Sequence, residues 1–329
     1  MIVVTGGAGF IGSALVCELN NRGYDDILIV DHLGTTEKWK NLVALRYSAY
    51  LEKDQFIRRL EADEFGDHID ALLHLGACSS TTEQDASYLM ENNFRYTERI
   101  AGWWDQHRAT RFIYASSAAT YGDGAHGYRD GTELLDRLRP LNMYGYSKHL
   151  FDKIAQRNGW LDRIVGLKFF NVFGPNEYHK GDMRSVINKA FSRVRDEGII
   201  SLFRSYHPDY GDGEQLRDFI YVKDAVAMTL FFMEHPSVGG LFNIGTGTAR
   251  SWNDVARSLF SALGKEPRID YIAMPEVLRD KYQYFTQADL TALRTVGCDY
   301  QCRSLEDSIA EYAVTYLDHG AYCEPQELP

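Results

Sequence analysis

Residues 2–12, IVVTGGAGFIG, decide the fold of this chain. A short β-branched run, Ile2–Thr5, is followed at once by glycines at GxxGxxG spacing and then by an amphipathic stretch, Ile11–Asn21. The three glycines are Gly6, Gly9 and Gly12. Glycine suits such a turn because the backbone must bend tightly, approach a phosphate closely and pack against the next helix, whose N-terminus offers free N–H groups to an anion. The stretch therefore predicts a strand, a turn and a helix that hold a dinucleotide.

Short apolar runs alternate with amphipathic stretches along the next part of the chain. Ile27–Asp31, Ala71–Gly76 and Arg111–Ser116 predict buried strands, and Glu83–Gln106 and Tyr144–Arg157 predict helices. Strands that are apolar on both faces and separated by helices are typical of a parallel sheet that is covered on both sides. The sequence therefore predicts an α/β fold of the Rossmann type, with a doubly wound parallel sheet.

The alternation continues through Ile164–Val172, which we expect to form one strand, and through a late pair of strands, Phe219–Val222 and Leu241–Ile244, and then loosens. Tyr206–Gln215 is rich in turn formers and predicts a surface loop, whereas Arg268–Ile272 predicts a strand in a smaller mixed α/β lobe. We expect two parts: a dinucleotide-binding domain of residues 1–172 and 213–247, and a C-terminal substrate lobe of residues 173–212 and 248–329.

The composition excludes several classes of protein. The 329 residues include 35 Lys and Arg against 46 Asp and Glu, so the formal charge is −11, whereas nucleic-acid and anionic-membrane binders need a basic surface. The longest apolar run, Ala225–Met233, is too short to span a bilayer, and the first residues lack a signal-peptide pattern. We therefore expect a cytoplasmic protein. Five cysteines without CxxC spacing, and histidines without a ligand pattern, predict no metal site.

The form of the dinucleotide is left open by the residues that follow the second predicted strand. Asp31 lies at the end of that strand, where a carboxylate accepts hydrogen bonds from the adenosine ribose and favours NAD. Lys38 and Lys53 follow, and a cation near this position favours the 2′-phosphate of NADP. Both cofactors therefore remain candidates from these residues alone.

A Tyr and a Lys four residues apart predict the chemistry of the site. Tyr144 and Lys148 share one helical face, so the ammonium is expected to lower the phenol pKa and to contact a nicotinamide ribose. A tyrosinate can take the proton of a substrate hydroxyl while hydride leaves the carbon, and Ser117 at the preceding strand end can bond the same oxygen. Tyr146 is a competing phenol, but only Tyr144 has the required spacing.

These motifs resemble the extended short-chain dehydrogenase/reductases that modify nucleotide-sugars. Further stretches narrow the resemblance to the ADP-L-glycero-D-manno-heptose 6-epimerases: ACSSTTE at 77–83, ASSAATYG at 115–122, FNVFGP at 170–175, HKG at 179–181, RDF at 217–219 and FTQADL at 285–290. The likeness extends from Met1 to about Leu317. It implies inversion of C6″ of ADP-D-glycero-D-manno-heptose through a transient ketone, tightly bound NADP, a homo-oligomer, and a role in making the heptose precursor of lipopolysaccharide.

The resemblance also implies site residues. Because the two epimers present their hydroxyls in different places, a second proton-transfer group is expected in addition to Ser117, Tyr144 and Lys148. In the family it is the lysine of HKG, here Lys180, whose pKa burial or a cationic neighbour must lower. The cofactor residues implied are Phe10, Ile11, Asp31, His32, Lys38, Lys53, Leu75, Gly76, Ala77, Cys78, Ser79, Asn92, Lys148 and Val172. The substrate residues implied are Ser79, Ser117, Asn171, Asp182, Lys189, Phe203, Arg204, Ser205, Tyr206, Arg217 and Tyr282.

Several departures and alternatives accompany this reading. His32 stands where the family has Asn, and Asp182 where it has Ser; Asn176 and Tyr178 interrupt the usual GPREGHKG. Arg217 suits a diphosphate, but it could instead pair with its neighbour Asp218.

Three other functions are alternatives: another nucleotide-sugar epimerase, a 4,6-dehydratase, and a non-catalytic dinucleotide sensor. The dehydratases generally carry an Asp-Glu pair where this chain has Ala118-Ala119, and a sensor would not need the Tyr-Lys pair.

Overall fold

A seven-stranded parallel sheet forms the larger part of the computed structural model, which describes residues 1–279 and 282–326. The strand order is β10-β6-β5-β4-β1-β2-β3, and every neighbouring pair is parallel. The strands are β1 (Ile2–Thr5), β2 (Ile27–Asp31), β3 (Ala49–Glu52), β4 (Ala71–His74), β5 (Arg111–Ser117), β6 (Val165–Phe169) and β10 (Gly240–Ile244). The chain leaves β1 toward β2 and returns to β4 on the other side, so the predicted doubly wound sheet is confirmed.

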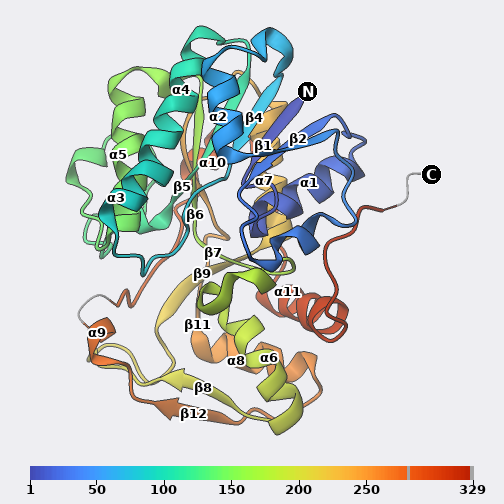
Figure 1. The fold of residues 1–329 in the computed structure, drawn as a ribbon. Coiled ribbons are helices and arrows are strands. Elements are labelled where there is room, and N and C mark those ends of the chain that lie inside the picture. Colours follow the sequence, from blue (N-terminus) through green and yellow to red (C-terminus); the bar gives the residue numbers. More distant parts are fainter. Residues whose placement is uncertain (280–281, 327–329) are drawn as a thin grey trace.

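Helices cover both faces of this sheet (Figure 1). One face packs against α1 (Phe10–Asn21) and α7 (Val222–Glu234), and the other against α2 (Lys53–Glu61), α4 (Tyr96–Gln106) and α5 (Met143–Arg157). Successive residues of a strand enter opposite cores because strand side chains alternate in direction: Val4 packs with α1, and Val3 packs with α2.

A smaller lobe lies at the carboxyl side of the sheet and contains two short sheets (Figure 1). One sheet has the order β11-β9-β7 and the other pairs β12 with β8. Its strands are β7 (Asn171–Phe173), β8 (Ile200–Phe203), β9 (Leu216–Tyr221), β11 (Ala249–Ser251) and β12 (Ile269–Ile272); its helices include α6 (Val186–Glu197), α8 (Trp252–Ala262) and α11 (Leu305–Glu311). The remaining short helices are α3 (Ala86–Leu89), α9 (Glu276–Arg279) and α10 (Thr291–Thr295).

Two predicted elements differ from the structure. The expected strand Ile164–Val172 is two strands, because the Phe170 N–H still bonds Ile244 of the large sheet while Asn171 already pairs with β9 of the small one. The expected helix Glu83–Gln106 begins only at Ala86, since the Asp85 side chain caps it by accepting from the Tyr88 N–H. Tyr206–Gln215 is a loop between β8 and β9, as predicted.

Within residues 1–279 and 282–326, no helix combines the length and apolar character needed to cross a membrane.

Candidate active site

The glycine turn after β1 forms one wall of the site. Gly6 has φ +70°, and a Cβ there would lie 2.7 Å from the Gly76 backbone nitrogen. A Cβ on Gly12 would lie 2.0 Å from the Gly6 carbonyl oxygen. Glycine is therefore required at both positions, for a left-handed backbone at one and for close helix approach at the other. Gly9 precedes α1 directly, so the helix N-terminus faces this turn, as a pyrophosphate site requires.

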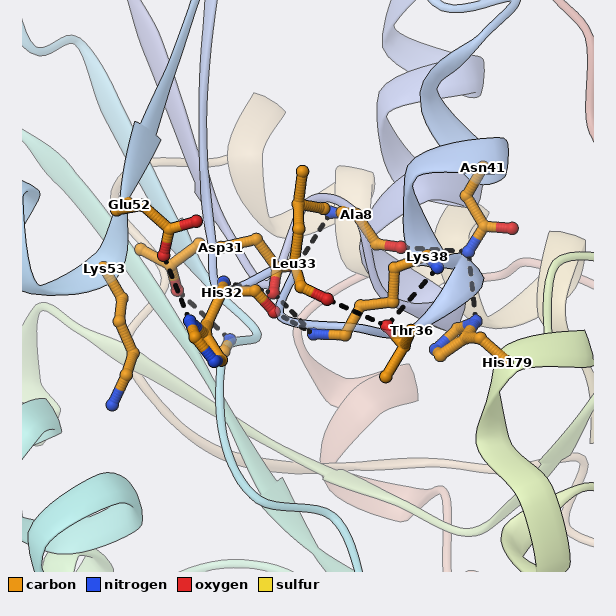
Figure 2. A network of polar contacts seen from close by, with 12 residues as sticks. Ala8, Asp31, His32, Leu33, Thr36, Lys38, Asn41, Glu52, Lys53 and His179 are labelled. Carbon is orange, nitrogen blue, oxygen red and sulfur yellow. Dashed lines mark hydrogen bonds and ion pairs between the residues drawn. The ribbon is translucent and has the colours of Figure 1, made fainter.

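A buried carboxylate and an ammonium lie together beside this turn (Figure 2). Asp31 accepts from the Ala8 N–H at 2.9 Å and from the His32 N–H at 2.7 Å. The Lys38 Nζ donates to Asp31 Oδ1, the oxygen that also accepts from the His32 N–H, at 2.7 Å, and to the His32 carbonyl at 3.0 Å. The two residues that gave opposite signals for NAD and NADP are thus paired with each other.

A cavity opens between the ends of β1, β2 and β4. Residues predicted for the cofactor that line it are Gly6, Asp31, His32, Lys38, Lys53, Gly76, Ala77, Cys78 and Asn92. Lys53 donates to the Asn92 side-chain oxygen at 2.5 Å, so a second ammonium reaches the same cavity. Thr5, Val30, Tyr88 and Tyr96 complete the lining and were not predicted, because only folding brings their separate segments together. The glycine turn, the N-terminus of α1 and a cavity lined by a carboxylate and two lysines fit a dinucleotide.

Tyr144 lies at the start of α5, opposite the end of β5. A Cβ on Gly145 would lie 2.7 Å from the Ala119 carbonyl oxygen, so this glycine permits the close approach of α5 to the 3-10 turn that follows β5. Burial raises the pKa of Tyr144, and the neighbouring Ser117 side chain acts in the opposite direction. The structure thus brings the predicted Tyr and Ser together.

Lys148 is buried one turn further along α5. Its Nζ donates to the Ala115 carbonyl of β5 at 2.8 Å, and burial lowers its pKa to about 8, while Asp152 and Cys78 raise it. We expected Lys148 to lower the phenol pKa of Tyr144; in the structure burial outweighs such an effect and the phenol pKa is raised.

Lys180 approaches the site from a separate segment, the 3-10 turn Tyr178–Met183. Its Nζ lies 5.2 Å from the centre of the Phe10 ring, at the start of α1. Burial lowers the pKa of Lys180, and nearby Glu177 opposes this shift. The direction is the one that a lysine base requires.

Hydrogen bonds tie the Lys180 segment to the glycine turn. The Asn41 amide donates to the Ala8 carbonyl at 2.9 Å and lies 3.3 Å from His179 Nδ1, as Figure 2 shows. Asn176, which interrupts the family's usual stretch, donates to the Ser13 hydroxyl at 2.9 Å and accepts from the Cys323 N–H at 2.8 Å. The sequence did not predict these contacts of Asn41 and Asn176, because their partners are distant in the chain.

Arg217 is buried in the smaller lobe. It donates to the Leu216 and Gln283 carbonyls, and its guanidinium carbon lies 5.0 Å from the centre of the Tyr282 ring. Asp218 instead accepts from Thr246, Gly247 and Ala288. The alternative of an Arg217–Asp218 pair is therefore wrong, and within the described ranges no carboxylate forms an ion pair with Arg217. A buried guanidinium of this kind suits an anionic ligand.

Two further cavities collect the other predicted substrate residues. One is lined by Lys189, Phe203 and Tyr282 with Trp252, and the other by Asn171, Asp182 and Lys189. The second is also lined by Val172, which was predicted for the cofactor.

Three predicted residues contact neighbouring segments instead. Arg204 donates to the Tyr271 carbonyl at 3.1 Å, the Ser205 N–H to Asp212 at 2.8 Å, and the Tyr206 ring packs under Arg279. The first two of these contacts join the loop after β8 to β12 and close the loop on itself, and the third joins it to α9.

Comparisons with known proteins give a consistent picture. Residues 2–245 match the family model described as NAD dependent epimerase/dehydratase family. An ADP-L-glycero-D-manno-heptose-6-epimerase of Nitratidesulfovibrio vulgaris strain DP4 is 55% identical over 317 residues, 96% of this chain and 98% of that protein. One of Fusobacterium nucleatum is 45% identical over 96% of this chain and 98% of that protein.

Solved structures are similar along nearly the whole chain. That of Helicobacter pylori ADP-L-glycero-D-manno-heptose-6-epimerase has a TM-score of 0.80 at 27% identity and covers 96% of both chains. A Thermus thermophilus UDP-glucose 4-epimerase in complex with NAD has a TM-score of 0.75 at 22% identity, covering 97% of this chain and 99% of that one, and shares the fold.

Proposed function

The chain belongs to the NAD dependent epimerase/dehydratase family, and from this premise we propose that it inverts C6″ of ADP-D-glycero-D-manno-heptose to the L-glycero-D-manno epimer through a transient 6″-ketone. The observation that supports the proposal is that two candidate proton-transfer groups come from separate segments, one near Cys78 of the dinucleotide cavity and one at the start of α1. Tyr144 faces Ser117 at the end of β5, and Lys180 lies over Phe10 at the start of α1.

The cofactor is a nicotinamide dinucleotide, and we propose its NADP form. When bound, it supplies reversible acceptance of hydride at the nicotinamide. Gly6, Gly9 and Gly12 would hold the pyrophosphate against the N-terminus of α1. Lys38 and Lys53 both reach the cavity at the Asp31 corner and would neutralise the charge of a 2′-phosphate.

Side chains of this protein transfer the proton of the C6″ hydroxyl. Tyr144, once ionised, accepts the proton of the C6″ hydroxyl, and the Ser117 hydroxyl donates to the same oxygen and orients it. Lys148 stays charged near neutral pH, and its Nζ donates to the Ala115 carbonyl. Lys180 exchanges the proton of the other epimer, whose hydroxyl is directed elsewhere, and its buried position favours the neutral amine that this requires.

The smaller lobe would bind the nucleotide-sugar substrate. Arg217 would hold the diphosphate, because its buried guanidinium can form charge-assisted hydrogen bonds. Lys189 borders two cavities and provides a second cation for the same charge. We further propose a homo-oligomer that makes the heptose precursor of lipopolysaccharide, as the resemblance implies, and a cytoplasmic location, as expected from the sequence pattern.

Incubation with ADP-D-glycero-D-manno-heptose in D2O, followed by NMR of the C6″ configuration, tests the proposal. We expect both epimers to appear without deuterium at C6″, because hydride that never leaves the site does not exchange with solvent. Tyr144→Phe should abolish inversion, whereas Tyr146→Phe, an exposed phenol on the same helix, should retain it. Loss of water would indicate a dehydratase, and bound cofactor without turnover of any nucleotide-heptose would indicate a sensor; either result would overturn the proposal.

A further inference from the structure

A buried ion pair lies on the far side of the catalytic helix from solvent. Asp152 on α5 and Lys168 on β6 are 0% and 1% exposed, and the Lys168 Nζ lies 3.0 Å from Asp152 Oδ2. Asp152 follows Lys148 by four residues and Tyr144 by eight, so all three share one face of the helix. The mechanism described so far uses neither member of the pair.

Hydrogen bonds from this pair reach both catalytic segments. Asp152 accepts from the Tyr114 and Ser116 hydroxyls, each at 2.8 Å, and both residues lie on β5. Lys168 donates to the Thr120 hydroxyl at 2.7 Å, and Thr120 in turn donates to the Ser117 carbonyl at 2.8 Å. The pair therefore fixes the strand end that carries Ser117 against the helix that carries Tyr144 and Lys148.

Stability alone does not account for such a pair. Removing two charges from water costs about as much as their attraction returns, and well-packed apolar residues of similar size are often as stabilising. A fully buried pair with three polar partners is instead suited to holding one arrangement of its neighbours.

We propose that Asp152 and Lys168 are positioning residues of the catalytic centre: they fix Ser117 against Tyr144, and the Asp152 charge holds Lys148 in its ammonium form. This inference rests on the proposed function, since it concerns the same reaction.

The electrostatic part follows from the charged groups around Lys148. Burial lowers its pKa to about 8, and Asp152 from its own helix and Cys78 from the segment after β4 raise it. His74 on β4 is also near and fully buried, but burial and Lys148 lower its pKa to about 3, so it is neutral near pH 7. Asp152 is therefore the carboxylate that keeps Lys148 charged, and Lys168 partly offsets it.

Single variants of the two residues separate this role from a structural one. We expect Asp152→Asn to shift the alkaline loss of kcat to lower pH by about one pH unit, and Lys168→Met to shift it to higher pH. Both should lower kcat about tenfold or more near neutral pH with little change in KM, because Ser117 and Tyr144 lose their fixed arrangement. The NADP-induced rise in melting temperature, followed against pH, gives the same shifts without turnover.

Each single variant leaves one buried charge unpaired and could therefore misfold. A double variant that removes both charges keeps the inference testable in that case. Asp152→Leu with Lys168→Met removes both charges and should fold, with a lower kcat and an alkaline limb at lower pH. The control is Lys153→Met on the same helix, which breaks an exposed pair with Asp136 and should behave as wild type.

Wild-type kcat and pH dependence in the double variant, or equal shifts in both single variants, would overturn the inference. Failure of the wild-type protein to bind NADP or to epimerise would instead refute the proposed function.

Discussion

Replacement of Lys38 by Ala tests the choice of cofactor. Lys38 lines the cavity, where its ammonium forms an ion pair with Asp31. Its side chain is still 23% exposed, so the ammonium is available to a phosphate bound beside Asp31. Asp31 is held by two backbone N–H groups as well and keeps its position without the lysine. The substitution therefore removes one cation and leaves the ribose carboxylate in place.

The expected size of the effect follows from Coulomb's law. A phosphate charge about 4 Å from the ammonium gains about 4 kcal/mol at an effective dielectric constant of about 20. Partial exposure and the competing charge of Asp31 reduce this to about 2 kcal/mol. At 1.4 kcal/mol per factor of ten, Lys38→Ala should weaken NADP binding about 30-fold. NAD lacks the phosphate and should bind as before.

Calorimetric titration of cofactor-free protein with NADP and with NAD measures both affinities. Lys40→Ala is the matched control, because Lys40 lies on the same 3-10 turn, pairs with Glu37 at 2.7 Å and does not line the cavity. Tighter binding of NAD than of NADP by the wild-type protein, or an equal loss for both cofactors in Lys38→Ala, would refute the assignment of Lys38 to a 2′-phosphate.

Three further substitutions test other parts of the site. Gly6→Ala places a Cβ 2.7 Å from the Gly76 nitrogen at φ +70°, so it should abolish the NADP-induced rise in melting temperature and cost about 2 kcal/mol or more of folding stability, read from denaturant unfolding. Lys180→Met should slow one direction of epimerisation about 100-fold while cofactor remains bound, as rates measured from each pure epimer will show; near-normal rates both ways would remove Lys180 from the mechanism. Arg217→Met should raise KM for the nucleotide-sugar roughly 10-fold to 100-fold in steady-state assays, and an unchanged KM would exclude the diphosphate contact.

Local sequence signals predicted the central features well. The glycine turn and the strands β1 and β2 occur at the predicted residues, because turn geometry and buried strand patterns depend on a few neighbouring positions. The Tyr144–Lys148 spacing correctly placed both side chains on one helix face, since helical periodicity is also local.

Features that depend on tertiary contacts were not predictable in the same way. The break at Phe170 arises because the chain changes from one sheet to another, and nothing in the apolar run marks that position. The raised phenol pKa of Tyr144 reflects burial by distant segments. Arg204 contacts β12 and Ser205 contacts Asp212 of its own loop, and a comparison of motifs does not show these contacts.

Cys323, in the C-terminal segment, helps to hold the candidate active site together. The Cys323 N–H bonds Asn176, and Asn176 bonds Ser13 on the first turns of α1, so the tail, the Lys180 segment and the dinucleotide helix are joined through one amide. A shortened protein that stopped at Leu317 would retain every motif that identifies the family and still lose this brace. Fusion partners and affinity tags are therefore better attached after a spacer at this terminus, so that the brace stays intact.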